Sequence, residues 1–511
     1  MNSSQNELGY FSQMPVCDKH LSSELNSDFT LPDYKCEIRR LLSVKATVVP
    51  PNEYVSNASA QLDGDILYKI LYLGADGELY SLDLSDKYAF KLPLDFGFYA
   101  VNPDDLTLIC NVNQENVGAK VLGPRKLNLK AKLSLHALGF SPELHTPNLV
   151  GAHNSSNIEK LINKTQCASI KKCSSEAEII SDFVSLDSTI DSVRVIDCSQ
   201  NVSINECTAQ SSQISIRGEV ILKLIYCNDA QSTMPITTIR KIPFNKSIDC
   251  DMVNSTYECS CFGIVNNERI DVQENGIGIE GRLILYARAQ KNDEVSYIAD
   301  AFSTEKEAEV SYSNIKIPCA LKSSNGNLTE NEVFPLDEIG ISRDAKILDT
   351  TAVPHTDECS LKDGRLSIKG RCDYQLIYCL DGEYASKTLS APFKYEIDCK
   401  CAHNHTLPAS FFVNANINSA KARCDAERLF VDCELGFDVF ALCESETTLL
   451  SEMIFGQARQ NHKNELLICY PDREATLWSV AKQYGEPVSA IKKRNSISEN
   501  DGTIKRRFLV I

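Results

Sequence analysis

Hydrophobic and polar residues alternate strictly along three long segments of this chain. In each segment a glycine is followed eight residues later by a tyrosine: Gly64 and Tyr72, Gly218 and Tyr226, Gly370 and Tyr378. The segments lie 154 and 152 residues apart. A period of two is typical of a strand with one face on a core and one face in water. The pattern therefore predicts three copies of one domain-sized unit, with the glycine at a bend or at a close backbone approach.

A second alternating strand closes each unit, at 127–135, 277–285 and 429–437. We predict a mainly β fold of three tandem antiparallel β-sandwich-like repeats, followed by a small α+β (βααβ) module. The expected divisions are a flexible N-terminus at 1–26, repeats at 27–142, 179–304 and 336–455, polar linkers at 143–178 and 305–335, and a module at 463–511. Repetition of this length favours a scaffold over a single buried active site.

The last fifty residues follow a different pattern. Apolar residues at 477, 480, 481 and 484 have helical spacing, and Pro487 suits the first turn of a second helix. Short apolar strands at 466–469 and 508–511 flank the two helices. This order predicts a compact β-α-α-β unit.

Charge separates the module from the rest of the chain. The whole sequence has 52 Lys and Arg against 69 Asp and Glu, a net charge of −17, which disfavours nucleic acid as a ligand. Residues 463–511 alone have nine basic and six acidic residues, so we expect this segment to meet a different partner. No secretory signal and no apolar run of membrane-spanning length is visible, which predicts a cytosolic protein. The 21 cysteines are then expected to be buried thiols that crosslink only if the protein later enters an oxidising shell.

Two segments resemble known families. The opening Leu31-Pro32-Asp33-Tyr34-Lys35-Cys36, followed by the glycine-to-tyrosine strand, resembles the SPOCS domain of endospore-forming bacteria, and residues 300–304 are similar to its closing motif. This resemblance covers about residues 27–455. Residues 476–485, Thr-Leu-Trp-Ser-Val-Ala-Lys-Gln-Tyr-Gly, resemble a LysM domain. LysM domains usually bind N-acetylglucosamine glycans between the loop before the first helix and the loop after the second.

The combination implies a function. SPOCS repeats followed by LysM resemble the SipL-like family of coat morphogenesis proteins, whose LysM domain docks on a spore-coat ATPase. The resemblance implies a non-enzymatic coat adaptor in the mother-cell cytosol, located at the forespore surface, without a cofactor. The alternative is a peptidoglycan-binding wall or cortex protein. The sequence departs from the LysM pattern at both groove lips, with Glu474-Ala475 and Arg506-Arg507, which favours an acidic protein partner over a glycan.

The candidate partner- or glycan-binding residues all belong to the LysM segment. They are Thr476, Leu477, Trp478, Lys482, Ile491, Lys492, Arg494, Asn495, Arg506 and Arg507. Trp478 is the only tryptophan, and it is expected either to pack between helix and sheet or to be an exposed anchor for a partner. The basic run 492–494 is either a solvated helix face or a surface that steers an acidic partner.

One further cluster has the residue types of a metal site. Cys399, Cys401, His403 and His405 offer four zinc-type donors, but single-residue spacing is closer than the two or more intervening residues of ordinary zinc sites. We therefore favour no metal, and a crosslinking role for the cysteines over a metal-binding one. No phosphate-binding glycine loop, His-Glu-x-x-His or Gly-x-Ser-x-Gly element is present, so we do not expect an enzyme.

Overall fold

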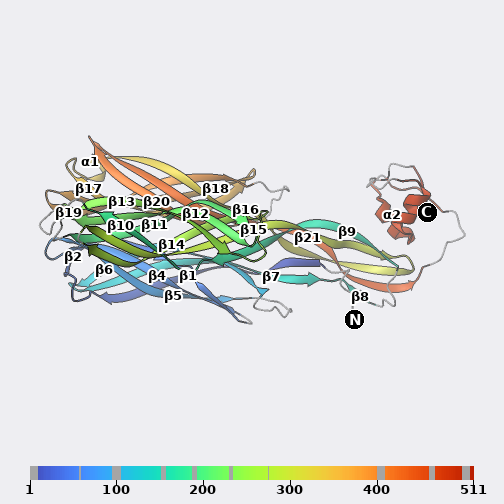
Figure 1. Ribbon diagram of the computed structural model, residues 1–511. Helices are drawn as coiled ribbons and strands as arrows, with labels where there is room; N and C mark the ends of the chain where they lie inside the picture. The colour runs from blue at the N-terminus through green and yellow to red at the C-terminus, as the bar shows by residue number, and fades with distance from the viewer. Residues whose placement is uncertain are drawn as a thin grey trace.

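The computed structural model describes residues 10–56, 59–94, 105–150, 157–186, 193–228, 234–273, 275–399, 409–459, 467–472, 474–497, 504 and 507–511. The structure is mainly β, with several antiparallel sheets and a short helical C-terminal module, which confirms the predicted fold class. Figure 1 shows the strands gathered in a broad body that narrows on one side into an extension.

Repeat 1 consists of two sheets that share one apolar core. One sheet contains β2 (Ile38–Val48), β3 (Asn52–Val55), β4 (Ser59–Gly74) and β5 (Leu79–Pro93). The other contains β1 (Tyr10–Thr30), β6 (Thr107–Gly123) and β7 (Lys126–His145), with β7 in the centre. The inward residues of the two central strands, β4 and β7, are almost fully buried, as the alternation predicts.

Repeats 2 and 3 have the same arrangement. In repeat 2, one sheet is β11 (Arg194–Gln210), β12 (Gln213–Cys227) and β13 (Ile236–Asp249), and the other is β9 (Ile158–Ser174), β10 (Glu178–Ser185), β14 (Glu258–Gln273) and β15 (Gly276–Ser303). In repeat 3, one sheet is β17 (Lys346–Lys362), β18 (Arg365–Leu380) and β19 (Glu383–Asp398). The other is β8 (Asn148–Val150), β16 (Lys306–Pro335), β20 (Ala409–Asp425) and β21 (Arg428–Ala458). A single-turn helix, α1 (Leu336–Ile339), follows β16.

The repeated glycine lies where another chain segment comes very close. A Cβ at Gly218 would collide with the backbone carbonyl of Ser203, and one at Gly370 would collide with that of His355. In repeat 1 the equivalent glycine faces the ring of Tyr88 instead. The expected close backbone approach is confirmed at Gly218 and Gly370, whereas at Gly64 the close neighbour is the side chain of Tyr88.

The three repeats meet around a common apolar centre. Equivalent residues of the three repeats, spaced by the same 154 and 152 positions, belong to one buried cluster: Leu42, Ile196 and Leu348; Leu71, Ile225 and Ile377; Leu73, Cys227 and Cys379. Because each set contributes one member from every repeat, the repeats form a closed ring with approximate threefold symmetry.

Equivalent polar side chains also link each repeat to the next. The links run from Lys69 to Asp197, from Lys223 to Asp349, and from the amide of Gln375 to the backbone carbonyl of Leu42. Both lysines additionally donate to the carbonyl of the residue after their aspartate, at 2.6 and 2.7 Å. The third link thus closes the ring with a neutral amide where the other two use ion pairs.

The segments expected to be flexible or linker-like contain strands. The N-terminal segment 1–26 lies largely in β1, which pairs with β7; 143–178 contains β8 and β9; and 305–335 is almost entirely β16, which pairs with β21. Their outward faces are polar, which gives them the composition of a linker. Their backbone groups are nevertheless satisfied by long antiparallel ladders. The repeats are therefore one interlocked body and not beads on flexible connections.

The extension in Figure 1 is a β stalk. It is made by the distal parts of β9, β15, β16 and β21, with β8 beside them, and the C-terminal module lies at its far end. The stalk has its own apolar core around Ile298, Ala301, Leu450 and Met453. In the part of the chain that the structure describes, no helix has both the length and the apolar character needed to cross a membrane.

Candidate functional site: the C-terminal module and its docking on the stalk

The module folds as predicted from its helical spacing. Strands β22 (Ile468–Cys469) and β23 (Leu509–Val510) pair antiparallel, and helices α2 (Leu477–Tyr484) and α3 (Val488–Arg494) lie between them in sequence. Thr476 begins α2 with a capping box: its hydroxyl accepts from the backbone N–H of Ser479, and the Ser479 hydroxyl accepts from the backbone N–H of Thr476. Thr476 is exposed, but its hydroxyl takes part in this helix cap, which gives the side chain a structural role.

Three of the predicted binding residues lie in the interior of the module. Leu477 and Ile491 belong to its buried core, with Ile491 fully buried. Asn495 is also buried; its amide donates to the carbonyls of Ile491 and Val510 and accepts from the N–H of Val510. Asn495 joins the end of α3 to β23, and Leu477 and Ile491 pack in the core, so all three have a structural role within the module. Their contact with a partner stays a prediction.

Trp478 and Lys482 face the stalk. The indole N–H of Trp478 donates to a carboxylate oxygen of Asp300 at 2.8 Å, and the Lys482 ammonium bonds both oxygens of the same carboxylate at 2.6 and 2.8 Å. The Trp478 ring also meets Phe302 edge to face, with ring centroids 5.0 Å apart. The lone tryptophan is thus half-buried: it packs against the apolar cluster that the module shares with Phe302, and it bonds to β15 of the stalk.

The local strand structure sets the direction of the Asp300 side chain. A register shift in the β9–β15 ladder lies between Ile298 and Asp300, and such bulges re-aim side chains. The Tyr312 hydroxyl of β16 also donates to Asp300, at 2.8 Å. Burial by itself would raise the pKa of Asp300, but the hydrogen bonds from Lys482, Trp478 and Tyr312 outweigh it and hold this pKa below its usual value.

A second contact fixes the C-terminal end of α2. The guanidinium of Arg459, just after β21, donates to the backbone carbonyls of Lys482 and Gln483 at 3.3 and 3.4 Å, and also to the carbonyl of Lys306 at 3.1 Å. A cation at this end complements the helix dipole. Gly485 ends the helix with φ 68°, and a side chain there would collide with Arg459. The module is therefore held to the stalk both along one face of α2 and at its end.

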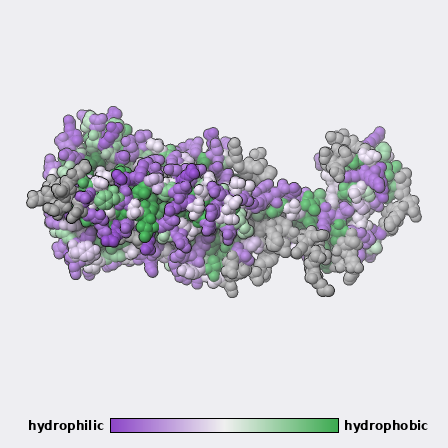
Figure 2. Space-filling view, in the orientation of Figure 1, coloured by the Kyte–Doolittle hydropathy of each residue, from purple (hydrophilic) through white to green (hydrophobic). Residues whose placement is uncertain are grey.

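The module also has an exposed apolar surface in and beside β22 and β23 that the sequence patterns did not reveal. Ile468, Tyr470 and Phe508, which we call the outer patch, have exposed fractions of 48%, 71% and 50%. The rings of Tyr470 and Phe508 lie 6.5 Å apart. Their neighbours Cys469 and Leu509 point into the core, so strand alternation was the available signal. On the face drawn in Figure 2, the body is mostly hydrophilic and its apolar residues form small separate patches.

The basic candidates are distributed around the module. Lys492 is half-buried, and Arg494 is exposed and donates to Glu486 at 3.1 Å. Arg507 is exposed next to the outer patch, whereas Arg506 lies outside the described residues.

The proposed donors of the Cys-x-Cys-x-His-x-His run are only partly described. Cys399 is fully buried in the core of repeat 3, and burial raises the pKa of its thiol to about 11. Cys401, His403 and His405 lie outside the described residues. Cys399 therefore has the environment of a core residue.

A cavity of about 860 Å³ lies between the three repeats. Lys45, Ser199 and Thr351 line it from equivalent positions, together with several amide side chains. Burial lowers the pKa of Lys45, against the opposing effect of the carboxylates Asp349 and Asp197. Ligand pockets are mostly apolar with a few polar groups. We therefore interpret this cavity as a polar junction of the ring.

Comparison with known proteins supports the assignment of the module. Residues 474–505 match the LysM domain family, so the chain contains a C-terminal LysM domain. This match spans both helices and the capping box, and it does not extend to the repeats. No curated protein and no solved structure matches the chain significantly. LysM domains bind peptidoglycan and related glycans or proteins, and the SPOCS resemblance of the repeats stays a prediction.

Proposed function

We propose that this protein is a non-enzymatic assembly scaffold of a bacterial spore coat, recruited to the forespore surface when its LysM domain binds a coat morphogenetic ATPase. In this proposal the protein acts from the mother-cell cytosol and needs no cofactor. The ring of repeats supplies a rigid body, and the stalk carries the recruiting domain away from it.

The observation that carries this proposal is the orientation of the LysM domain. One face of α2 is bonded to Asp300, and the end of the helix is bonded to Arg459. The outer patch belongs to other elements of the module, β22 and β23 and the residues beside them, and it is exposed to solvent. An exposed aromatic pair beside an arginine has the composition of a protein–protein hot spot.

Charge favours a protein partner over a glycan. Residues 463–511 contain nine basic and six acidic residues on a chain whose net charge is −17. An uncharged N-acetylglucosamine chain gains nothing from a cationic surface, whereas an acidic protein surface is attracted to it. Arg507, at the lip next to Phe508, is placed to meet such a partner.

A second function is favoured by the same aromatic side chains. Tyr470 and Phe508 expose flat ring faces, which also suit stacking on sugar rings. The alternative is therefore a wall or cortex protein that binds peptidoglycan through LysM.

Binding of the purified full-length chain to two targets separates these functions. The targets are the immobilised coat ATPase and purified peptidoglycan, tested with the wild type and with the double variant Tyr470→Ser, Phe508→Ser. We expect retention on the ATPase, weakened roughly 30-fold in the variant because an aromatic hot spot is worth about 2 kcal/mol. Tyr34→Ser removes an 83% exposed tyrosine of the body and is the matched control. Retention on peptidoglycan alone would contradict the proposal.

A further inference from the structure

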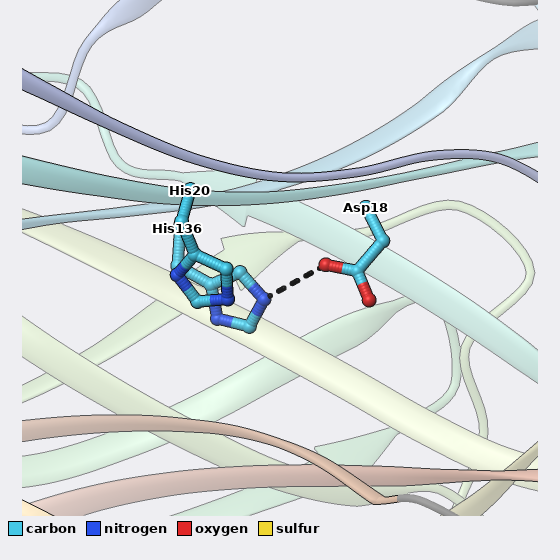
Figure 3. Close-up of side chains that lie close together, drawn as sticks. All are labelled: Asp18, His20 and His136. Carbon is cyan, nitrogen blue, oxygen red and sulfur yellow. Dashed lines mark hydrogen bonds and ion pairs between the residues drawn. The ribbon is translucent and has the colours of Figure 1, made fainter.

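Three metal-binding side chains project from one face of repeat 1. Asp18 and His20 belong to β1, and His136 belongs to β7 (Figure 3). His20 and His136 are directly opposite each other in the antiparallel ladder, and Asp18 precedes His20 by two residues. Residues two apart on a strand share a face, so the ladder itself brings the three side chains together.

The distances suit a small cation. One donor atom from each side chain lies within 4.8 Å of the others, and Asp18 Oδ1 is 3.3 Å from His136 Nε2. Zinc binds imidazole nitrogen and carboxylate oxygen at about 2.0–2.2 Å, so two ligands of a tetrahedral ion lie roughly 3.3–3.5 Å apart. The Asp18–His136 pair already has this separation.

The third donor needs one movement that the structure permits. The rings of His20 and His136 are stacked, with centroids 4.0 Å apart and planes at 14°, and stacked rings do not direct their nitrogen lone pairs at one point. His20 is exposed, so its ring is free to turn toward the pair. His136 is held from its other side by the buried ring of Phe412, 4.4 Å away.

The protonation state of the fixed histidine also suits a ligand. Metal binding requires neutral imidazole. Burial and the neighbouring His20 lower the pKa of His136, against the opposing effect of Asp18. A lowered pKa favours the neutral imidazole, which is the form that binds a metal.

We propose that Asp18, His20 and His136 bind a divalent cation of the zinc type, with water completing the coordination. Two imidazoles and one carboxylate select such borderline-soft ions over Mg²⁺ and Ca²⁺, which prefer all-oxygen sites. The ion joins the N-terminal strand β1 to β7 beside the contact with Phe412 of repeat 3. The site is specific to repeat 1, because the equivalent positions of His136 are Tyr286 and Asp438, and Asp438 is already paired with Arg288.

Titration of the metal-free full-length protein with Co²⁺ and with Zn²⁺ tests this site. We expect one equivalent bound, with a Co²⁺ absorption spectrum free of thiolate charge-transfer bands, because the ligands are nitrogen and oxygen. Asp18→Asn and His20→Ala, both at exposed positions, are each expected to weaken binding at least tenfold. His355→Ala is the matched control: His355 Nε2 lies 3.2 Å from Asp373, and no second histidine joins this pair among the described residues. Absence of stoichiometric binding, a thiolate spectrum, or unchanged affinity in Asp18→Asn and His20→Ala would overturn the proposal.

Discussion

Asp300→Ala is expected to release the LysM domain from the stalk. The substitution removes the acceptor for Trp478, Lys482 and Tyr312 at once. It leaves the edge-to-face contact with Phe302 and the bonds from Arg459. The hydrogen bond from Lys482 to the Tyr312 hydroxyl at 3.2 Å also remains. Among the described contacts, however, the docked state loses its only shared anionic centre.

The size of the effect follows from those bonds. A hydrogen bond to a charged group is worth about 1.5–3 kcal/mol, but bonds that share one acceptor are not additive. The Lys482 side chain is 30% exposed and that of Asp300 is 16% exposed, so solvent screens part of the ion pair. We therefore expect a loss of roughly 2–4 kcal/mol in docking free energy, which is a factor of about 30 to 1,000 in the docking equilibrium.

Trp478 reports this change directly because it is the only tryptophan in the chain. Undocking exposes the indole and frees the small domain to rotate, so we expect a red-shifted emission and a faster anisotropy decay. Asp293→Ala is the matched control, since Asp293 lies on the same strand and pairs with Lys291 at 2.8 Å. Unchanged emission and anisotropy in Asp300→Ala would refute the inferred docking.

Three other predictions test the docking and the ring. Because the docked carboxylate has a lowered pKa, docking is complete above about pH 4 and is lost as the pH falls through the lowered pKa, which tryptophan emission can follow. Lys223→Met removes the ion-pair partner of the buried Asp349, which keeps only the charge of Lys45 nearby, and should lower stability by about 3–5 kcal/mol. Gln375→Met at the equivalent neutral link should cost about 1–3 kcal/mol, and equal losses in denaturant unfolding would contradict the ring. Gly370→Ala places a Cβ against the carbonyl of His355 and should lower the melting temperature. Gly118→Ala, which has open space around it, should not, and similar melting temperatures for the two variants would contradict the close approach at Gly370.

The sequence predicted what local periodicity determines. Alternation located the central strands of each repeat, and helical spacing with Pro487 located α2 and α3. The glycine at a close approach was also visible, because only a residue without a side chain fits there. The match to the LysM family confirms the module that these local signals outlined.

Long-range pairing was not predictable in the same way. The polar segment 305–335 was expected to be a linker, although Ile315, Ile317, Cys319 and Leu321 alternate, and the structure places it in β16. No local pattern indicates that this strand pairs with β21, because the paired residues lie from 93 (Pro335 and Arg428) to 152 (Lys306 and Ala458) positions apart. Ring closure depends on equivalent positions in different repeats, and those are recognised as partners only when the repeats are placed side by side.

The docking of the module was missed for a related reason. In the sequence, Asp300 stands out only as part of a segment similar to the SPOCS closing motif, and Trp478 is expected either to pack between helix and sheet or to anchor a partner. Their bond joins positions far apart in sequence, and the bulge that aims Asp300 depends on the partner strand β9. Substitution of Trp478 therefore perturbs docking as well as any partner contact, which makes the outer patch the better probe of recruitment.

The central claim is that the LysM domain recruits this scaffold by binding a protein. Side-by-side calorimetric titration of the full-length chain with the coat morphogenetic ATPase and with N-acetylglucosamine oligosaccharides tests it most directly. We predict saturable binding of the ATPase that weakens with added salt, since charge attraction contributes to it, and no measurable heat from the oligosaccharides. Saturable binding of the oligosaccharides without binding of the ATPase would contradict the claim.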